Sequence, residues 1–107
     1  MSQYHVVTTF KALEQLTEIE DYLIDNQSVE TASYVVEGLI EAIEALQNTP
    51  TRHPLLRLIE KKEFTYRYAP KWAYKIIFRV EENPPTVYVI TIIHSKQDQT
   101  WLDDILR

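Results

Sequence analysis

The chain has 107 residues, of which 45% are hydrophobic and 25% charged, and its formal net charge is −5. This length suits one hydrophobic core, so we expect a single globular domain over residues 1–107. The lack of cysteine excludes disulfides and thiolate chemistry, and no apolar run reaches the ~20 residues that span a bilayer. We therefore expect a cytoplasmic protein that does not contact membranes.

Charge is distributed unevenly along the chain. Residues 1–50 carry nine acidic residues and one basic residue, Lys11, whereas residues 51–80 carry eight basic and two acidic residues. Such a division favours the steering of a polyanion or an acidic peptide to one face. The alternative for the acidic half is that its charges are simply the solvated sides of two helices.

The first half of the sequence predicts a strand and two helices. Residues 4–10 are rich in β-branched and aromatic side chains, which favours a strand. Two stretches with apolar residues at helical spacing follow and predict two helices. Thr8 or Thr9 is expected to cap the first helix and Ser28 the second, which ends at Pro50. The short break at 26–28 predicts an antiparallel helical hairpin. The only glycine, Gly38, is expected to mark a close helix crossing.

The second half predicts three strands after an irregular connector over residues 51–63. Residues 64–69 and 74–80 alternate in polarity, and residues 86–93 are almost continuously apolar, as in a strand buried on both sides. Residues 98–106 have the spacing of a short terminal helix. The order β-α-α-β-β-β predicts an α+β fold in which the hairpin covers one face of a mainly antiparallel sheet and leaves the other open.

Several cations fall on the strands of this predicted sheet. If Tyr74, Ile76, Phe78 and Val80 face the helices, Lys75 and Arg79 lie on the open face. Arg67 joins them if Phe64, Tyr66 and Tyr68 point inward. Clustered cations suit an anion site, although strand cations also lie with their aliphatic stems along a sheet. The interleaved aromatics, including Trp72 and Tyr88, suit either stacking on bases or packing in a core and an interface.

Three segments resemble one protein family. Residues 74–80, Tyr-Lys-Ile-Ile-Phe-Arg-Val, are similar to a family strand with an aromatic, a basic residue, two aliphatics and an aromatic. Residues 89–98 are similar to its closing strand, which runs into a His-x-Arg-Gln-Asn/Asp-type end, and residues 13–23 are similar to its first helix. In this order and spacing, nearly the whole chain resembles the RelE/ParE toxin superfamily.

The resemblance implies the toxin of a type II toxin–antitoxin module, also called a plasmid stabilisation system. Its partner would be a cognate antitoxin whose C-terminal segment covers the working surface. ParE-like members inhibit DNA gyrase by binding it, and this is the mode that we expect here. The residues expected to bind the target or the antitoxin are Arg67, Lys71, Trp72, Lys75, Arg79 and Lys96. No cofactor or metal is expected, and a homodimer is left open.

A RelE-like enzyme that cleaves mRNA on the ribosome is the alternative. Its catalytic residues would be Lys75, Arg79, His94 and Lys96, with His94 as acid or base. The acidic net charge fits docking to ribosomal RNA poorly, and the chain ends in Ile-Leu-Arg, without the catalytic aromatic or histidine of such nucleases. Lys96 also replaces the arginine that is usual in the family, and a lysine lacks the planar guanidinium that binds phosphate or carboxylate through two parallel hydrogen bonds. Catalysis is therefore left open but disfavoured, and a third alternative is an inactive relic that still binds its partner.

Overall fold

The computed structural model describes residues 3–56 and 65–94. Its elements follow the predicted order: β1 (His5–Thr8), α1 (Phe10–Asn26), α2 (Val29–Glu44), β2 (Arg67–Lys71), β3 (Tyr74–Glu82) and β4 (Pro85–His94). Two short 3-10 turns, η1 (Ala45–Gln47) and η2 (Pro50–Arg52), follow α2. The predicted α+β fold is confirmed, whereas the predicted terminal helix over 98–106 lies outside the described residues.

Side-chain caps set the starts of both helices. Thr9 caps α1 by accepting a hydrogen bond from the Ala12 amide at 3.3 Å, and Ser28 caps α2 by accepting one from the Thr31 amide at 3.0 Å. Each bond satisfies a first-turn donor that has no partner within its helix. The Thr9 hydroxyl also donates to the carbonyl of Val89 at 2.7 Å, which fixes the start of α1 against β4.

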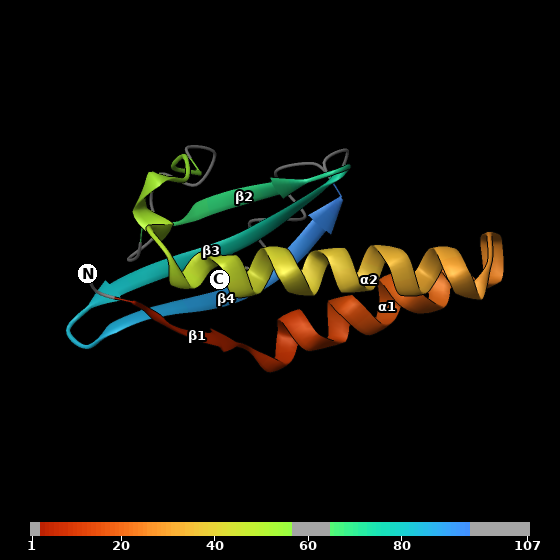
Figure 1. Cartoon of the computed structure of the whole chain (residues 1–107), viewed down its shortest axis with the longest axis horizontal. Coiled ribbons are helices and arrows are strands. Elements are labelled where there is room, and N and C mark those ends of the chain that lie inside the picture. Colours follow the sequence, from red (N-terminus) through yellow and green to blue (C-terminus); the bar gives the residue numbers. More distant parts are fainter. Residues whose placement is uncertain (1–2, 57–64, 95–107) are drawn as a thin grey trace.

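The four strands form one sheet in the order β1-β4-β3-β2. β1 runs parallel to β4, and the other two pairings are antiparallel (Figure 1). The strand predicted over 64–69 was expected to stop at Pro70, but β2 continues through Pro70 to Lys71. Proline is tolerated there because β2 is the edge of the sheet, where a missing amide donor breaks no ladder bond.

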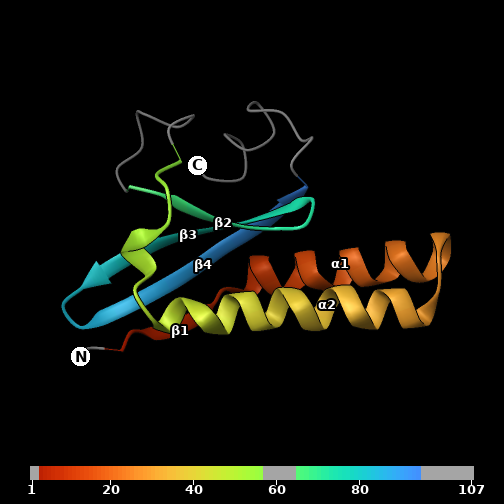
Figure 2. The same cartoon turned by 45° about the horizontal axis from the view of Figure 1, so that its top comes forward.

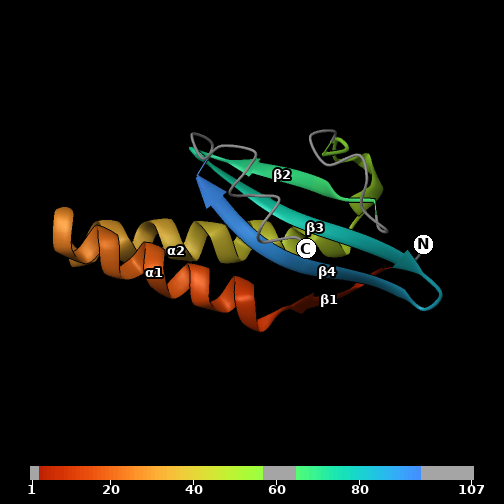
Figure 3. The same cartoon turned by 180° about the vertical axis from the view of Figure 1, so that it is seen from behind.

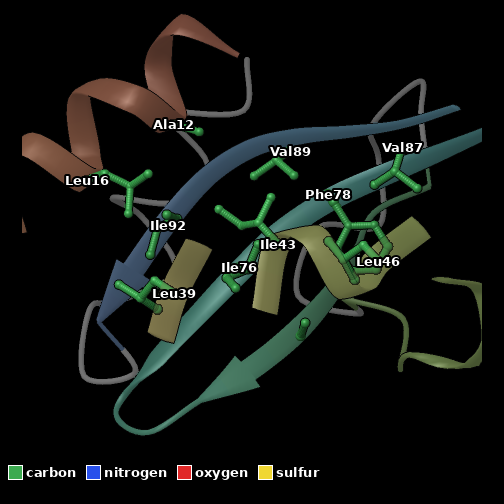
Figure 4. Close-up of a cluster of buried hydrophobic side chains, with 11 residues drawn as sticks. Ala12, Leu16, Leu39, Ile43, Leu46, Ile76, Phe78, Val87, Val89 and Ile92 are labelled. Carbon is green, nitrogen blue, oxygen red and sulfur yellow. The ribbon is translucent and has the colours of Figure 1, made fainter. Parts of the chain in front are cut away.

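Both helices lie on one side of the sheet, and the tip of their hairpin extends beyond it (Figure 2). The main core fills the space between these layers. It joins buried side chains from every layer (Figure 4): Ala12, Leu16, Leu39, Ile43, Leu46, Ala69, Ile76, Phe78, Val87, Val89 and Ile92. No helix in the described part of the chain is long and apolar enough to cross a membrane.

A β-bulge in β4 explains its long apolar run. Ile77 pairs with Thr91 while the next residue, Phe78, pairs with Val89, so Ile90 is the extra residue. The bulge shifts the alternation by one position, so that both Val89 and Ile92 reach the helix-covered face. β4 is also buried on both sides, as predicted.

The face opposite the helices is not simply open, as the sequence had suggested. It carries a second buried cluster of Leu56, Tyr66, Ile77 and Ile93, with Tyr68 and Ile90 packed against it. Figure 3 views the sheet from this side. The expectation failed because Tyr66 and Tyr68 point away from the helices and bury apolar surface there.

Candidate functional site

Lys75 and Arg79 lie together on the face opposite the helices, as predicted. Tyr74, Ile76, Phe78 and Val80 all pack in or against the main core, so the intervening side chains of β3 point the other way. The register places Lys75 beside Ile93 and Arg79 beside Tyr88. Ile77 lies between the two cations on β3 and is fully buried. The two cations therefore project on either side of a buried apolar side chain.

Each of these cations lies over a tyrosine ring. Lys75 Nζ is 4.7 Å from the ring centroid of Tyr68, and Arg79 Cζ is 4.4 Å from that of Tyr88. Arg79 also forms an ion pair with Glu81, two residues along the same strand. Cation–π contacts of this kind hold long side chains flat and leave their polar edges at the surface. We call this side of the sheet the tyrosine–cation face, after its surface residues Tyr68, Lys75, Arg79, Glu81 and Tyr88.

Arg67 does not join that face. It pairs with Phe78, so it lies on the helix side of β2, and its guanidinium donates to the carbonyl of His53 at 2.7 Å. The His53 ring packs edge-on against Phe78, with centroids 5.7 Å apart. Burial, and then the charge of Arg67, lower the pKa of His53. Arg67 therefore joins β2 to the turn after α2, and its expected grouping with Lys75 and Arg79 is wrong.

His94 also lies on the side of the sheet that faces the helices. It pairs with Tyr74 and packs edge-on against it, with ring centroids 5.5 Å apart. Both line a cavity of about 620 Å³ whose other wall includes Glu18 and Tyr22 of α1. Burial, and then the neighbouring Tyr22, raise the pKa of Tyr74, so its hydroxyl keeps its proton at neutral pH.

The residues predicted for a nuclease are therefore divided. Lys75 and Arg79 project from one side of the sheet and His94 from the other, so one phosphate group cannot contact all three without rearrangement of the sheet. General acid–base chemistry requires its groups within hydrogen-bond reach of the same reacting atoms. Lys96, the fourth residue predicted for this site, lies outside the described residues.

Lys71 and Trp72 belong to a separate site where the β2–β3 hairpin meets α2. A cavity of about 250 Å³ lies there, lined by Tyr34, Glu37, Gly38, Glu41, Lys71 and Trp72. The rings of Tyr34 and Trp72 have centroids 5.5 Å apart, and Lys71 Nζ is 4.6 Å from the Trp72 ring. We call these six residues the Trp72 corner.

Gly38 makes room for this tryptophan. A Cβ atom at position 38 would lie 2.2 Å from Cη2 and 2.8 Å from Cζ3 of Trp72, well inside van der Waals contact. The predicted close approach at Gly38 thus exists, but the partner is the hairpin and not a crossing helix. Sequence reasoning missed Tyr34, although it lies four residues before Gly38 and so shares a side of α2 with it.

Comparison with known proteins agrees with this architecture. The family model described as "ParE toxin of type II toxin-antitoxin system, parDE" matches residues 6–99. Among solved structures, the chromosomal ParDE system from P. aeruginosa is similar with a TM-score of 0.68 and 21% identity, over 86% of this chain and 96% of that chain.

The RelBE2 toxin–antitoxin complex from Mycobacterium tuberculosis is similar with a TM-score of 0.58 and 23% identity, over 88% of this chain and 93% of that chain. A search of curated proteins by sequence gives no match. At these low identities the solved structures show the shared fold, and the family match spans most of the sequence. The chain therefore belongs to the ParE toxin family of type II toxin–antitoxin systems.

Proposed function

We propose that this chain is a cytoplasmic ParE-type toxin that inhibits DNA gyrase by binding it and is neutralised by a cognate antitoxin. The observation that carries the proposal is the tyrosine–cation face, with Lys75 over Tyr68 and Arg79 over Tyr88. Tyrosine and arginine are enriched among the side chains that dominate protein–protein binding energy. A surface of this composition suits recognition of a protein better than a chemical reaction.

The electrostatics of this face favour a protein partner over RNA. Arg79 is already paired with Glu81, and the chain as a whole carries a net charge of −5. Affinity for nucleic acid depends on neutralising many phosphates, which an acidic chain with two partly engaged cations does poorly. An acidic segment of a partner protein needs only a few such contacts, and these would also fix its orientation.

The antitoxin part of the proposal is supported by the family and by the neighbours. Both solved structures are named as toxin–antitoxin systems or complexes. For this chain we propose that the antitoxin lies across the tyrosine–cation face and the helical hairpin, where it would exclude the target. An acidic antitoxin segment would complement Lys75 and Arg79.

Expression of the chain without its antitoxin tests the proposal. We expect growth arrest with DNA-damage signalling and intact mRNA, and inhibition of supercoiling when purified gyrase is mixed with the purified chain. Coexpression with the protein encoded by the adjacent reading frame should restore growth. Codon-positioned mRNA breaks would instead establish a RelE-like nuclease, and normal growth with uninhibited gyrase would establish an inactive relic. Either result overturns the proposal.

A further inference from the structure

The Trp72 corner is more exposed than a packing contact requires. Trp72 is 50% exposed and Tyr34 is 67% exposed, although the two rings contact each other. Trp72 also has a φ of 53°, a left-handed conformation that is unfavourable for a residue with a bulky side chain. The hairpin is thus held in a costly conformation that presents half of an indole ring to solvent beside α2.

The charged residues around the Trp72 indole are mainly acidic. Glu37 and Glu41 are exposed, lie one turn apart on α2 and line the cavity with the two rings. Within the described residues, neither carboxylate forms an ion pair. Among the residues that the structure describes, Lys71 supplies the only positive charge in the lining, and its ammonium lies over the Trp72 ring. With two carboxylates and one ammonium, this described lining carries a net negative charge.

The position of Lys71 indicates which kind of group suits the corner. The indole face attracts cations, and Trp is the strongest of the aromatic residues in this respect. A cavity of about 250 Å³ is small for a drug-sized ligand but suits the end of one long side chain. A guanidinium fits these walls better than an ammonium, because it can stack on an aromatic ring while its N–H groups bind a carboxylate in pairs.

We propose that the Trp72 corner receives the guanidinium of an arginine from a partner protein, with Lys71 as the internal cation that occupies part of the site in its absence. The arginine would lie against Trp72 and Tyr34 and pair with Glu37 and Glu41. This site is separate from the tyrosine–cation face and would select a basic residue, whereas that face would select acidic ones. The proposal does not depend on the identity of the toxin's target.

The test follows the indole N–H signal of Trp72 by NMR in the full-length chain. The chain has two tryptophans, so Trp72→Phe assigns the signal and Trp101 serves as an internal reference. The probes are N-acetyl-arginine methylamide, its neutral isostere N-acetyl-citrulline methylamide, and N-acetyl-lysine methylamide, all at constant ionic strength. We expect the arginine probe to shift the Trp72 signal and to bind at least about threefold more tightly than the lysine probe. Equal responses to arginine and citrulline would overturn the proposal, and so would no response to arginine.

Charge variants test the roles of the lining residues. Glu37→Gln with Glu41→Gln should weaken binding of the arginine probe about fivefold, whereas Glu30→Gln with Glu44→Gln, which removes two exposed charges elsewhere on α2, should leave it nearly unchanged. Equal effects of the two pairs would mean that only net charge matters, and would overturn the proposal.

Lys71→Met gives the sharpest test, because it removes the internal cation while keeping an unbranched apolar stem. It should strengthen binding of the arginine probe about threefold, since the two carboxylates lose their competitor. Lys75→Met makes the same change in net charge on the other side of the sheet and should have no such effect. Weaker binding in Lys71→Met would overturn the proposal.

One further arm distinguishes a protein side chain from a free metabolite. Free arginine carries an α-ammonium and an α-carboxylate whose interactions with Glu37 and Glu41 oppose each other, so it should bind no more tightly than the blocked probe. Tighter binding of free arginine would assign the corner to a small molecule and overturn the proposed protein partner.

Discussion

The two faces of the sheet are built from the same strands but differ in what covers them. On the helix-covered face, Ile76 and Phe78 are fully buried against side chains from α1 and α2. On the tyrosine–cation face, Ile77 is just as buried, but its neighbours on β3 are Lys75 and Arg79, which lie over tyrosines. The tyrosine–cation face thus combines a buried apolar centre with charged residues around it, which is the usual composition of a protein-binding surface. The helix-covered face is part of the core.

Ile76 and Ile77 offer the strongest test of this contrast, because they are adjacent, identical and both fully buried. Ile76→Ala should lower the free energy of unfolding by about 4 kcal/mol and Ile77→Ala by about 2 kcal/mol, as judged by urea denaturation. The reason for the difference is that the cavity left by Ile76 lies between two layers of regular structure that cannot collapse into it. Ile77 belongs to a smaller cluster that can adjust.

If either alanine variant fails to fold, Ile76→Val and Ile77→Val provide the same comparison. Each should lower the free energy of unfolding by about 0.5–1.5 kcal/mol, with the larger loss again at Ile76. Equal losses at the two positions would show that both faces are packed as cores. That result would contradict the assignment of the tyrosine–cation face as a binding surface.

Gly38 and Trp72 provide the next largest effect. Alanine in place of glycine normally stabilises a helix by up to about 1 kcal/mol, but here the new Cβ would clash with the indole. We expect Gly38→Ala to lower the free energy of unfolding by about 1 kcal/mol in the natural chain, and to raise it by about 0.5–1 kcal/mol when Trp72 is also alanine.

The quantity to measure is the coupling energy of this double-mutant cycle, from urea denaturation of the four proteins. Ser33→Ala, an exposed change on the same helix, serves as the control and should have the same small effect with and without Trp72. If Gly38→Ala stabilises the natural chain, the ring can leave the helix at little cost. The placement of Trp72 would then not depend on Gly38.

Most of the fold could be predicted because its determinants are local. The caps Thr9 and Ser28 each act on an amide three residues ahead, and the alternation of β3 assigns its residues to faces without reference to any other strand. The edge position of β2 could not be predicted in this way. It depends on strand order, and therefore the passage of the strand through Pro70 was missed.

The site was harder to predict, because face assignments in β2 depend on neighbours that are remote in sequence. Arg67 was expected beside Lys75 on the assumption that Phe64, Tyr66 and Tyr68 face the helices. In the structure Tyr68 pairs with Ile77 and faces away from them. The Trp72 corner joins residues 34–41 to a hairpin at least 30 residues later, so no local pattern could reveal it. Gly38 was the one visible sign, and it indicated a close approach without naming the partner.

His53 extends the comparison to pH, because it lies at the margin of the helix-covered core. Its pKa in the folded chain is lowered, so the unfolded chain binds a proton first as the pH falls. Its contribution to stability is therefore fully present above a pH of about 6.5 and is progressively lost below it. We expect the urea midpoint of the natural chain to fall more between pH 8 and pH 5.5 than that of His53→Gln. Parallel changes in the two proteins would show that His53 titrates alike in the folded and unfolded states.

Lys75 and Arg79 should give only a modest change in stability but the clearest change in function. Replacing both with alanine removes two partly buried cation–π contacts and the Arg79–Glu81 ion pair, which should lower the free energy of unfolding by only about 1–2 kcal/mol. If the tyrosine–cation face binds the target, growth inhibition and gyrase inhibition should nevertheless be largely lost.

Lys11→Ala with Arg52→Ala makes the same change in net charge at two exposed positions elsewhere and should keep full toxicity. Toxicity that survives in the Lys75/Arg79 variant would exclude this face as the working surface. Its loss in both double variants would show that the toxin depends on net charge and not on where the charges lie.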